Sequence, residues 1–308
     1  MSSKLTPALG IITVCAAAIL SGCMTSVRTA LAPATKDAIK STALTTGLVQ
    51  PEIGTDIVAS NAGAAAGATG GLIGGLVGGI IDSSVNTSRA KKAEAAADPV
   101  RNAMAGYDAN SKLRDTFRQV FPDAKYLPIL SVELAPTSDE AACKRILKSA
   151  TTDAVMIISV DHRFTPDFSR IKIEATATLY AKKPSLATEP AGALTVLYTN
   201  KFVLLGDDVV SGNNDSNIAY WAKDNAEHVK SALSTGFLEI AEMIAFDLPA
   251  GPEVNLPKKD TLETTAPSPH FPGQAVAQME LKGTVVHTHS TGHKWIRLAN
   301  GALCSLKK

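Results

Sequence analysis

Two neighbouring stretches decide the fold that this sequence predicts. Residues 153–164 read DAVMIISVDHRF, and residues 170–182 read RIKIEATATLYAK. The first is a branched apolar run of the length of a central strand, and its last polar residues, Asp161 and His162, are expected to be solvated. The second alternates apolar and polar residues from Ile171 to Leu179, which is typical of a strand with one buried and one wet face. The sequence therefore predicts a sheet with these two strands at its centre.

Further elements are predicted on both sides of this pair. Apolar residues recur at helical spacing before it, from Leu113 to Phe121, and after it on a long stripe from Ile218 to Ile244. The predicted order is helix, strand, helix, three strands and long helix, over residues 113–121, 126–132, 139–147, 153–164, 171–179, 192–206 and 215–246. Pro249 cannot continue a helix and ends the last one.

The fold class that follows is α+β, with a mixed sheet of about four strands packed by two or three helices over residues 100–249. Six prolines from Pro249 to Pro272 predict a Pro-rich linker over 250–273. Residues 274–308 predict a small C-terminal β module, in which Asn300-Gly301 is a good hairpin turn.

The 100–249 region resembles the α/β domain of envelope lipoproteins related to CsgG and to the N-terminal domain of TolB. The residues that carry the resemblance are SATTDAVMIISVDHRF (149–164), ATATLYAKK (175–183) with LYTNKFVL (197–204), and GFLEIAEMIAFDL (236–248). The resemblance implies a module that binds other envelope proteins or forms a homo-oligomer, and that is not an enzyme.

The N-terminus predicts a signal peptide over residues 1–22. Lys4 precedes a short apolar stretch, Ala8 to Leu20, that ends in small residues. Leu20-Ser21-Gly22-Cys23 resembles the lipobox of bacterial lipoproteins, which implies cleavage before Cys23 and acylation of its thiol and new amine. Met24, where an Asp would favour the inner membrane, implies an outer-membrane location facing the periplasm. The alternative is an ordinary secretory signal with an incidental cysteine.

Residues 23–60 have a weak pattern, which predicts a tether with one helical piece near 35–48. A glycine-rich run follows this stretch. Residues 63–82 read GAAAGATGGLIGGLVGGIID. On a helical wheel, branched aliphatic residues cover one half and glycines cover the other in two rows, Gly63, Gly67, Gly71, Gly75 and Gly79 beside Gly70, Gly74 and Gly78. Eight interior glycines cost on the order of 7 kcal/mol relative to alanine, so such a helix needs a close neighbour.

The run resembles the glycine-zipper segments of bacterial envelope lipoproteins, with Gly70-Gly71, Gly74-Gly75 and Gly78-Gly79 as the matching residues. This implies a membrane-associated helix over 61–82. About twenty residues make a helix of roughly 30 Å, the thickness of a hydrocarbon core. A flexible linker and a buried soluble helix are the alternatives, although linkers favour serine over Leu, Ile and Val.

The remaining signals concern cysteines, histidines and charge. Cys143 and Cys304 could form one disulfide in an oxidising compartment, or stay two buried thiols. His287, His289 and His293 are compatible with a Zn or Cu site, although a polar β surface is the alternative. The formal net charge of +1 and the lack of a basic patch argue against a nucleic-acid partner.

No phosphate-binding loop, nucleophile elbow or metalloprotease motif is present in the sequence, and no cofactor is expected. The leading hypothesis is a non-catalytic outer-membrane lipoprotein, held to lipid by acylated Cys23, that assembles or maintains an envelope complex through protein contacts. The first alternative is an oligomeric pore or secretion channel. The second is a periplasmic metal-binding protein that uses the tail histidines.

Overall fold

The computed structural model describes residues 26–56, 84–122, 126–137, 140–182, 186, 194–209, 213–250, 261–267, 278–298 and 300–307. The predicted signal peptide, the lipidation site Cys23 and the glycine run therefore lie outside the described residues. Among the described helices, none is long and apolar enough to cross a membrane. The helices are α1 (Pro33–Ala38), α3 (Ser84–Ala96), α4 (Asp98–Ala103), α5 (Ala109–Val120), α6 (Glu140–Ser149) and α7 (Asn214–Asp247).

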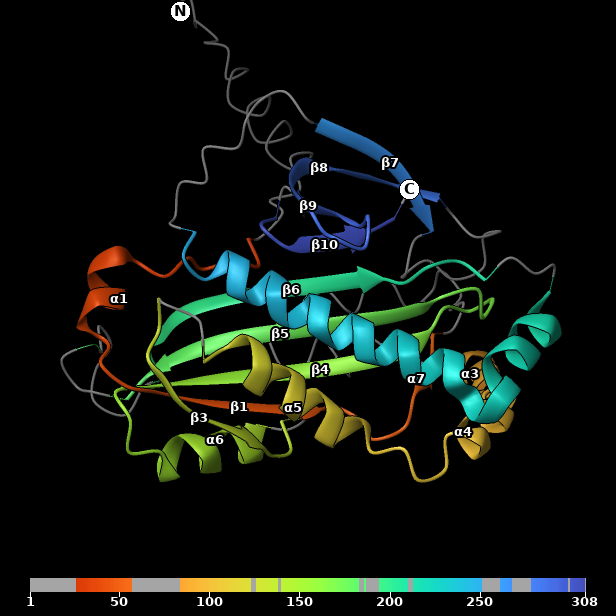
Figure 1. Cartoon of the computed structure of the whole chain (residues 1–308), viewed down its shortest axis with the longest axis horizontal. Helices are drawn as coiled ribbons and strands as arrows, with labels where there is room; N and C mark the ends of the chain where they lie inside the picture. Colours follow the sequence, from red (N-terminus) through yellow and green to blue (C-terminus); the bar gives the residue numbers. More distant parts are fainter. Residues whose placement is uncertain are drawn as a thin grey trace, which may run out of the picture.

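The strands form one large mixed sheet. They are β1 (Thr42–Leu48), β2 (Gly54–Thr55), β3 (Ile129–Leu134), β4 (Ala154–Phe164), β5 (Ile171–Ala181), β6 (Val196–Leu205), β7 (Thr261–Pro267), β8 (Gln278–Thr288), β9 (Lys294–Leu298) and β10 (Leu303–Leu306). The strand order is β3-β1-β4-β5-β6-β10-β9-β8-β7, and β2 pairs with β4 beside this path (Figure 1). The predicted α+β kind and the element order from α5 to α7 are confirmed.

The predicted sheet of about four strands is wrong, because two segments outside residues 100–249 join it. Residues 42–48, expected as part of a tether with a helical piece, form β1, which lies between β3 and β4 and is parallel to both. Three β-branched threonines favour a strand there. Gly47 is required because an added Cβ would lie 2.1 Å from the carbonyl oxygen of Ala135.

The C-terminal tail is the second segment that enlarges the sheet. β10 pairs in parallel with β6, and β9, β8 and β7 continue the sheet as antiparallel neighbours. β7 falls within the expected Pro-rich linker 250–273. The turn at Asn300-Gly301 forms as expected between β9 and β10, with Gly301 at a φ of 90°. The Asn-Gly sequence predicted this hairpin, but it did not predict that β10 would pair with β6.

Helices α5 and α7 cover one face of the central strands (Figure 1). Leu113 and Phe117 of α5 and Phe237 of α7 are fully buried in the main core, which also holds inward residues of β1, β4 and β5. Each such side chain contributes about 1.5–3 kcal/mol of burial free energy. α7 approaches β5 closely at Gly236, where an added Cβ would lie 2.4 Å from Cδ1 of Ile173.

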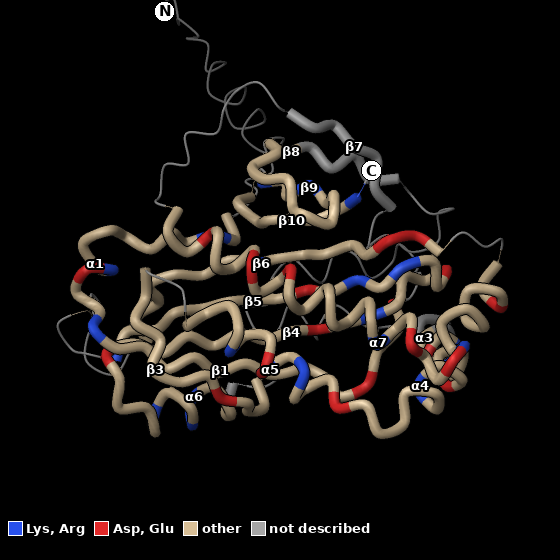
Figure 2. The backbone as a smooth tube through the Cα atoms, viewed as in Figure 1, with Lys and Arg blue, Asp and Glu red and all other residues tan. Residues whose placement is uncertain are grey.

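The other face of β5 was expected to be solvated, but it is largely buried. Lys172 is 2% exposed, and its Nζ lies 2.5 Å from Oδ2 of Asp56 and 3.3 Å from Oε1 of Glu174. Lys201 of β6 adds a contact of 3.1 Å to Glu174. The two charged residues of this alternating strand are thus buried as ion pairs, and Figure 2 marks positions of both signs on the central strands.

Helix α7 is interrupted near its start by a short left-handed turn. Asp224, Asn225 and Ala226 have φ values of 51°, 56° and 58°. For residues other than glycine this region is costly, although Asp and Asn tolerate it best. The turn divides the long predicted helix into two parts.

We expect Asn225→Val to lower the free energy of unfolding by about 1–2 kcal/mol, because a β-branched residue is strained at positive φ. Asn225→Gly should be neutral or slightly stabilising. Urea unfolding of both variants measures this. Glu227→Val, two residues along the right-handed helix, is the control and should cost only a few tenths of a kcal/mol. Equal losses at 225 and 227 would contradict the left-handed turn.

Candidate anchoring site and exposed sheet edge

The first described residues are bonded directly into the domain. The backbone N–H of Val27 donates to the carbonyl of Asn300 at 2.9 Å. Thr29 and Thr199 of β6 exchange two backbone hydrogen bonds of 2.8 and 3.0 Å. The chain therefore enters the fold by residue 27, between β6 and the tail, and not after a long tether.

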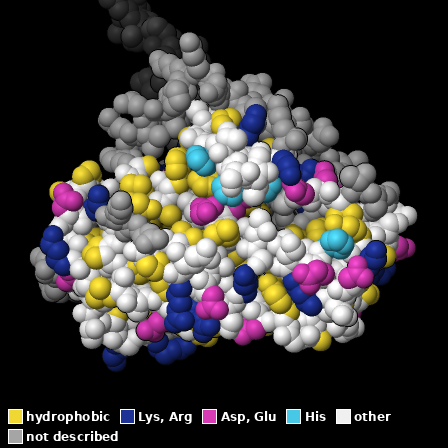
Figure 3. Space-filling model, viewed as in Figure 1, with side chains coloured by type: hydrophobic (Ala, Val, Ile, Leu, Met, Phe, Trp, Pro, Cys, Tyr) yellow, Lys and Arg dark blue, Asp and Glu magenta, His cyan; other side chains and the backbone are white. Residues whose placement is uncertain are grey.

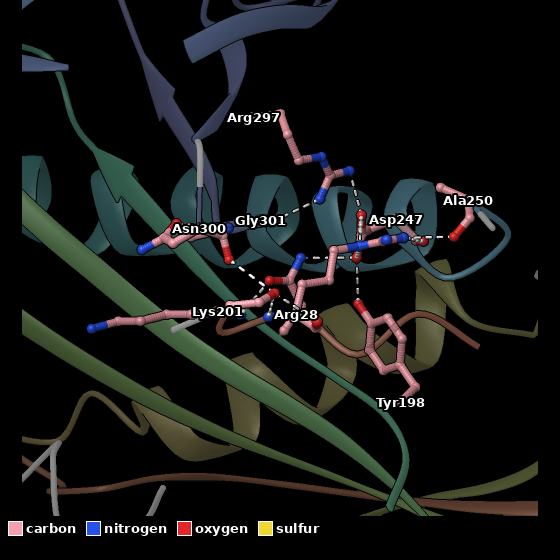
Figure 4. Close-up of polar contacts among 11 residues, drawn as sticks. Arg28, Tyr198, Lys201, Asp247, Ala250, Arg297, Asn300 and Gly301 are labelled. Carbon is pink, nitrogen blue, oxygen red and sulfur yellow. Dashed lines mark hydrogen bonds and ion pairs between the residues drawn. The ribbon is translucent and has the colours of Figure 1, made fainter. Parts of the chain in front are cut away.

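Asp247, the last residue of α7, is the centre of this junction (Figure 4). Its side chain is 0% exposed. Arg28 Nε donates to both carboxylate oxygens at 3.2 Å, and Arg297 of β9 donates to Oδ1. Tyr198 Oη and Asn200 Nδ2 of β6 donate to Oδ2 at 2.8 and 2.9 Å. We call these residues, Arg28, Tyr198, Asn200, Asp247 and Arg297, the anchoring site.

In the anchoring site the Asp247 carboxyl lies between two guanidinium groups, the geometry of charge-assisted hydrogen bonds. Burial and the neighbouring carboxylate raise the pKa of Tyr198 well above its ordinary value of 10.0, which keeps the phenol a donor. Arg28 also donates to the carbonyl of Ala250 at 2.5 Å, close to the carboxyl end of α7, where positive charge is stabilising. The site joins the N-terminus, β6, α7 and the tail, and it presents no reactive group to solvent.

A second buried carboxylate, Glu239, joins α7 to the tail two helical turns earlier. Its side chain is 0% exposed and accepts from His293 Nδ1 at 2.6 Å, from Trp295 Nε1 at 3.0 Å and from Ser305 Oγ. Burial opposes ionisation, but these hydrogen bonds hold the pKa of Glu239 below its ordinary 4.5. Burial likewise opposes the charged form of His293, but Glu239 and Asp207 together raise its pKa above 6.5.

The tail histidines, predicted as candidate metal ligands, instead pair with carboxylates. His289 Nε2 lies 2.7 Å from Oε2 of Glu242, and His293 pairs with Glu239. His287 is exposed and lies against Trp295, with ring centroids 4.4 Å apart. Figure 3 shows histidine and acidic side chains together where the tail meets the body. Within the described ranges no group of three or more His, Cys, Asp or Glu has a geometry that could hold a metal ion.

Of the two alternatives for Cys143 and Cys304, a disulfide or two buried thiols, the structure has the second. Cys143 lies on α6 and contacts the Thr137 carbonyl, with Sγ 3.9 Å from the oxygen. Cys304 lies on β10 in a separate apolar cluster with Leu205, Ile296 and Leu306. Burial raises the pKa of the Cys304 thiol to about 12, so it is a poor nucleophile. Cys143 packs against Val155 and Ile157 of β4, and β5 and β6 lie between β4 and β10 in the sheet.

His162, expected to be solvated, is instead fully buried on the α7 face of β4. Its ring lies edge-on to Phe237, with centroids 6.3 Å apart. Neither ring nitrogen has a hydrogen-bond partner among the described residues. Burial lowers the pKa of His162 to about 4, so the side chain is neutral in the folded state.

His162 should make the protein less stable in acid. Because its folded pKa of about 4 lies below the ordinary 6.5, the unfolded chain binds the proton first, and stability is lost as the pH falls from 6.5 towards 4. We expect about 2 kcal/mol of loss between pH 7 and pH 5 from this residue. The difference in unfolding free energy between the protein and His162→Leu measures it, and a pH-independent difference would contradict it.

Strand β3 forms one end of the sheet and exposes apolar side chains. Leu130 is 68% exposed and Leu134 is 36% exposed. Two shallow hollows of about 670 and 390 Å³ flank the strand and share Pro122, Ile129 and Leu130. Arg118 Nε donates to the carbonyl of Val132 at 3.1 Å, which protects part of the edge. An edge of this kind can accept another chain by strand pairing or side-chain contact.

Arg28, Asp247 and Glu239 belong to no motif. The signal that could have revealed two of them is GFLEIAEMIAFDL, where Glu239 and Asp247 interrupt an apolar stripe eight residues apart. Eight residues are close to two turns, so both carboxylates face the same side of α7. Nothing in the sequence points to Arg28, which lies 219 residues from Asp247.

No family model matches this chain, and no curated protein matches it. Among solved structures, the chain is similar to a PelC dodecamer from Paraburkholderia phytofirmans and to a point variant of it. The variant is 13% identical and has a TM-score of 0.25, covering 72% of this chain and 95% of that one. The PelC dodecamer is also 13% identical, with a TM-score of 0.22, covering 68% and 96%. Likenesses this weak carry no conclusion about the fold or function of this chain.

Proposed function

We propose that this protein is a lipid-anchored envelope protein that assembles or maintains a complex by protein–protein contact, without catalysis. The observation that carries the proposal is the open β3 edge, where Leu130 is 68% exposed. Isolated exposed leucines are common, but here two occupy one edge strand beside two hollows. Copies of this chain are the first partners that we propose, and other envelope proteins the second.

The proposed anchor is the acylated Cys23 of the lipobox, in the outer membrane and facing the periplasm. The anchoring site supports this proposal because it fixes residues 26–29 to the domain within a few residues of Cys23. A lipid attached there would hold the whole domain, and not only a loose N-terminal segment.

The glycine run enters the proposal as a close-packing element, not as a single membrane span. β1, before the run, and β4, after it, are paired in one sheet. A segment that crosses a bilayer once leaves its two flanks on opposite sides, which the β1–β4 pairing does not allow. Close contact through the rows at Gly71 and Gly75 stays part of the proposal.

Crosslinking in intact envelopes tests the proposed contact. We expect Leu130→Lys combined with Leu134→Lys to reduce crosslinked multimers several-fold, because charge on an edge strand opposes pairing. Leu194→Lys is the matched control, since Leu194 is 50% exposed and lies away from β3, just before β6. Undiminished crosslinking by the double variant would contradict the β3 contact. Cys23→Ser should move the protein from the membrane to the soluble fraction.

A further inference from the structure

We propose that the domain lies directly on the bilayer surface, with one defined face towards the lipid headgroups. That face, the anchor face, consists of Ser26, Thr29, Phe246, Pro249 and Asn300. The inference rests on the proposed acylation of Cys23 and adds the orientation that this acylation imposes. The partner is a phospholipid surface and not a protein.

The first step is the reach of the chain between the lipid and the fold. Three Cα–Cα steps separate Cys23 from Ser26, so even a fully extended chain spans only about 10–11 Å. The diacylglyceryl group on Cys23 would lie with its glycerol at the level of the headgroups. Ser26 must therefore lie within about 10–11 Å of that level.

The second step is that the chain is fastened at this point. Ser26 Oγ donates to the Arg28 carbonyl at 3.0 Å, and Val27 is bonded to Asn300. The side chain of Arg28 is 8% exposed and paired with the fully buried Asp247. Releasing the segment to lengthen the tether would leave Asp247 without one of its two cations, so the short reach is built into the fold.

The third step is the character of the anchor face. Phe246 is 37% exposed and Pro249 is exposed, which suits contact with an interface. The nearby Asp247 carboxylate is buried between two guanidinium groups, so it presents no bare negative charge to anionic headgroups. The far end of the sheet is β3, four strand spacings from β6, or about 19 Å away. Figure 1 shows the carboxyl end of α7 near β6 and the tail strands, and β3 with α6 towards the opposite end of the sheet.

Energy transfer from a protein label to labelled lipid tests this orientation. The acylated protein is placed in vesicles of phosphatidylethanolamine and phosphatidylglycerol that carry a headgroup-linked acceptor. A donor is attached at Pro249→Cys on the anchor face or at Glu133→Cys on β3. We expect transfer from position 249 to be at least twofold greater than from position 133. The unsubstituted protein, whose Cys143 and Cys304 are buried, gives the labelling background.

A second variant tests whether the short chain between Cys23 and Ser26 imposes the orientation. Ten Gly/Ser residues inserted after Met24 add a flexible tether of roughly 17 Å, and should reduce the difference between the two positions while the acyl group stays in place. Equal transfer from 249 and 133 in acylated, vesicle-bound protein would overturn the orientation alone. If the N-terminal peptide carried no added acyl mass and the protein did not bind vesicles, the proposed function would be overturned as well.

Discussion

Replacing Asp247 with alanine should lower the free energy of unfolding by about 3–5 kcal/mol. The substitution leaves Arg28 and Arg297, with side chains 8% and 6% exposed, without their shared carboxylate. It also removes the acceptor of Tyr198 and Asn200. The two buried guanidinium groups would keep carbonyl oxygens, such as those of Ala250 and Gly301, as acceptors but would lose the carboxylate that neutralises them, so the loss is far larger than that of a surface ion pair. Urea unfolding at neutral pH, followed by circular dichroism, measures the change.

A matched control comes from an exposed ion pair of the same chemistry. Asp208 is 52% exposed, and its partner Arg170 is 16% exposed. Asp208→Ala should cost no more than about 1 kcal/mol, because water screens an ion pair whose carboxylate is half exposed. If Asp247→Ala cost no more than Asp208→Ala, the anchoring site would not fasten the N-terminus, and the short reach in the proposed membrane orientation would lose its basis.

The second large effect is expected at Glu239. We expect Glu239→Ala to cost about 3–5 kcal/mol, because the buried carboxylate is the acceptor of His293, Trp295 and Ser305. The loss should appear first in the tail, so that limited proteolysis cuts after residue 278 before the main body unfolds. Glu242→Ala is the control, since Glu242 is 36% exposed and bonds only His289 among these groups. Equal effects at 239 and 242 would contradict the central role of the buried acid.

The Glu239–His293 contact also has a pH window with a defined sign. The folded pKa of His293 is raised above 6.5, so its contribution is present below 6.5 and is lost as the pH rises through the folded value. The folded pKa of Glu239 is lowered below 4.5, so its contribution is lost only as the pH falls through that lower value. Asp207, Glu242, His289 and Lys307 face the same cluster. The contact therefore stabilises the fold most between pH 4.5 and 6.5. The His293 contribution grows as the pH falls towards 6.5, whereas burial of His162 costs more stability as the pH falls.

The sequence alone determined those features that depend on short-range periodicity. The stripe of α7 and the apolar run of β4 predicted the order of elements from α5 to α7 correctly. The Asn300-Gly301 turn was equally readable, because glycine supplies the positive φ that the turn requires. The lipobox at Cys23 and the glycine rows stay predictions, since they lie outside the described residues.

Only the tertiary structure decided which distant segments meet. Residues 42–48 lack the continuous branched apolar run of a central strand, and they become β1 because β3 and β4 offer parallel partners on both sides. Lys172 alternates like a solvated residue, but Asp56 and Glu174 allow its burial. Arg28 and Asp247 carry no mutual signal across 219 residues. Pairing between strands and between buried charges depends on three-dimensional proximity, which local periodicity does not encode.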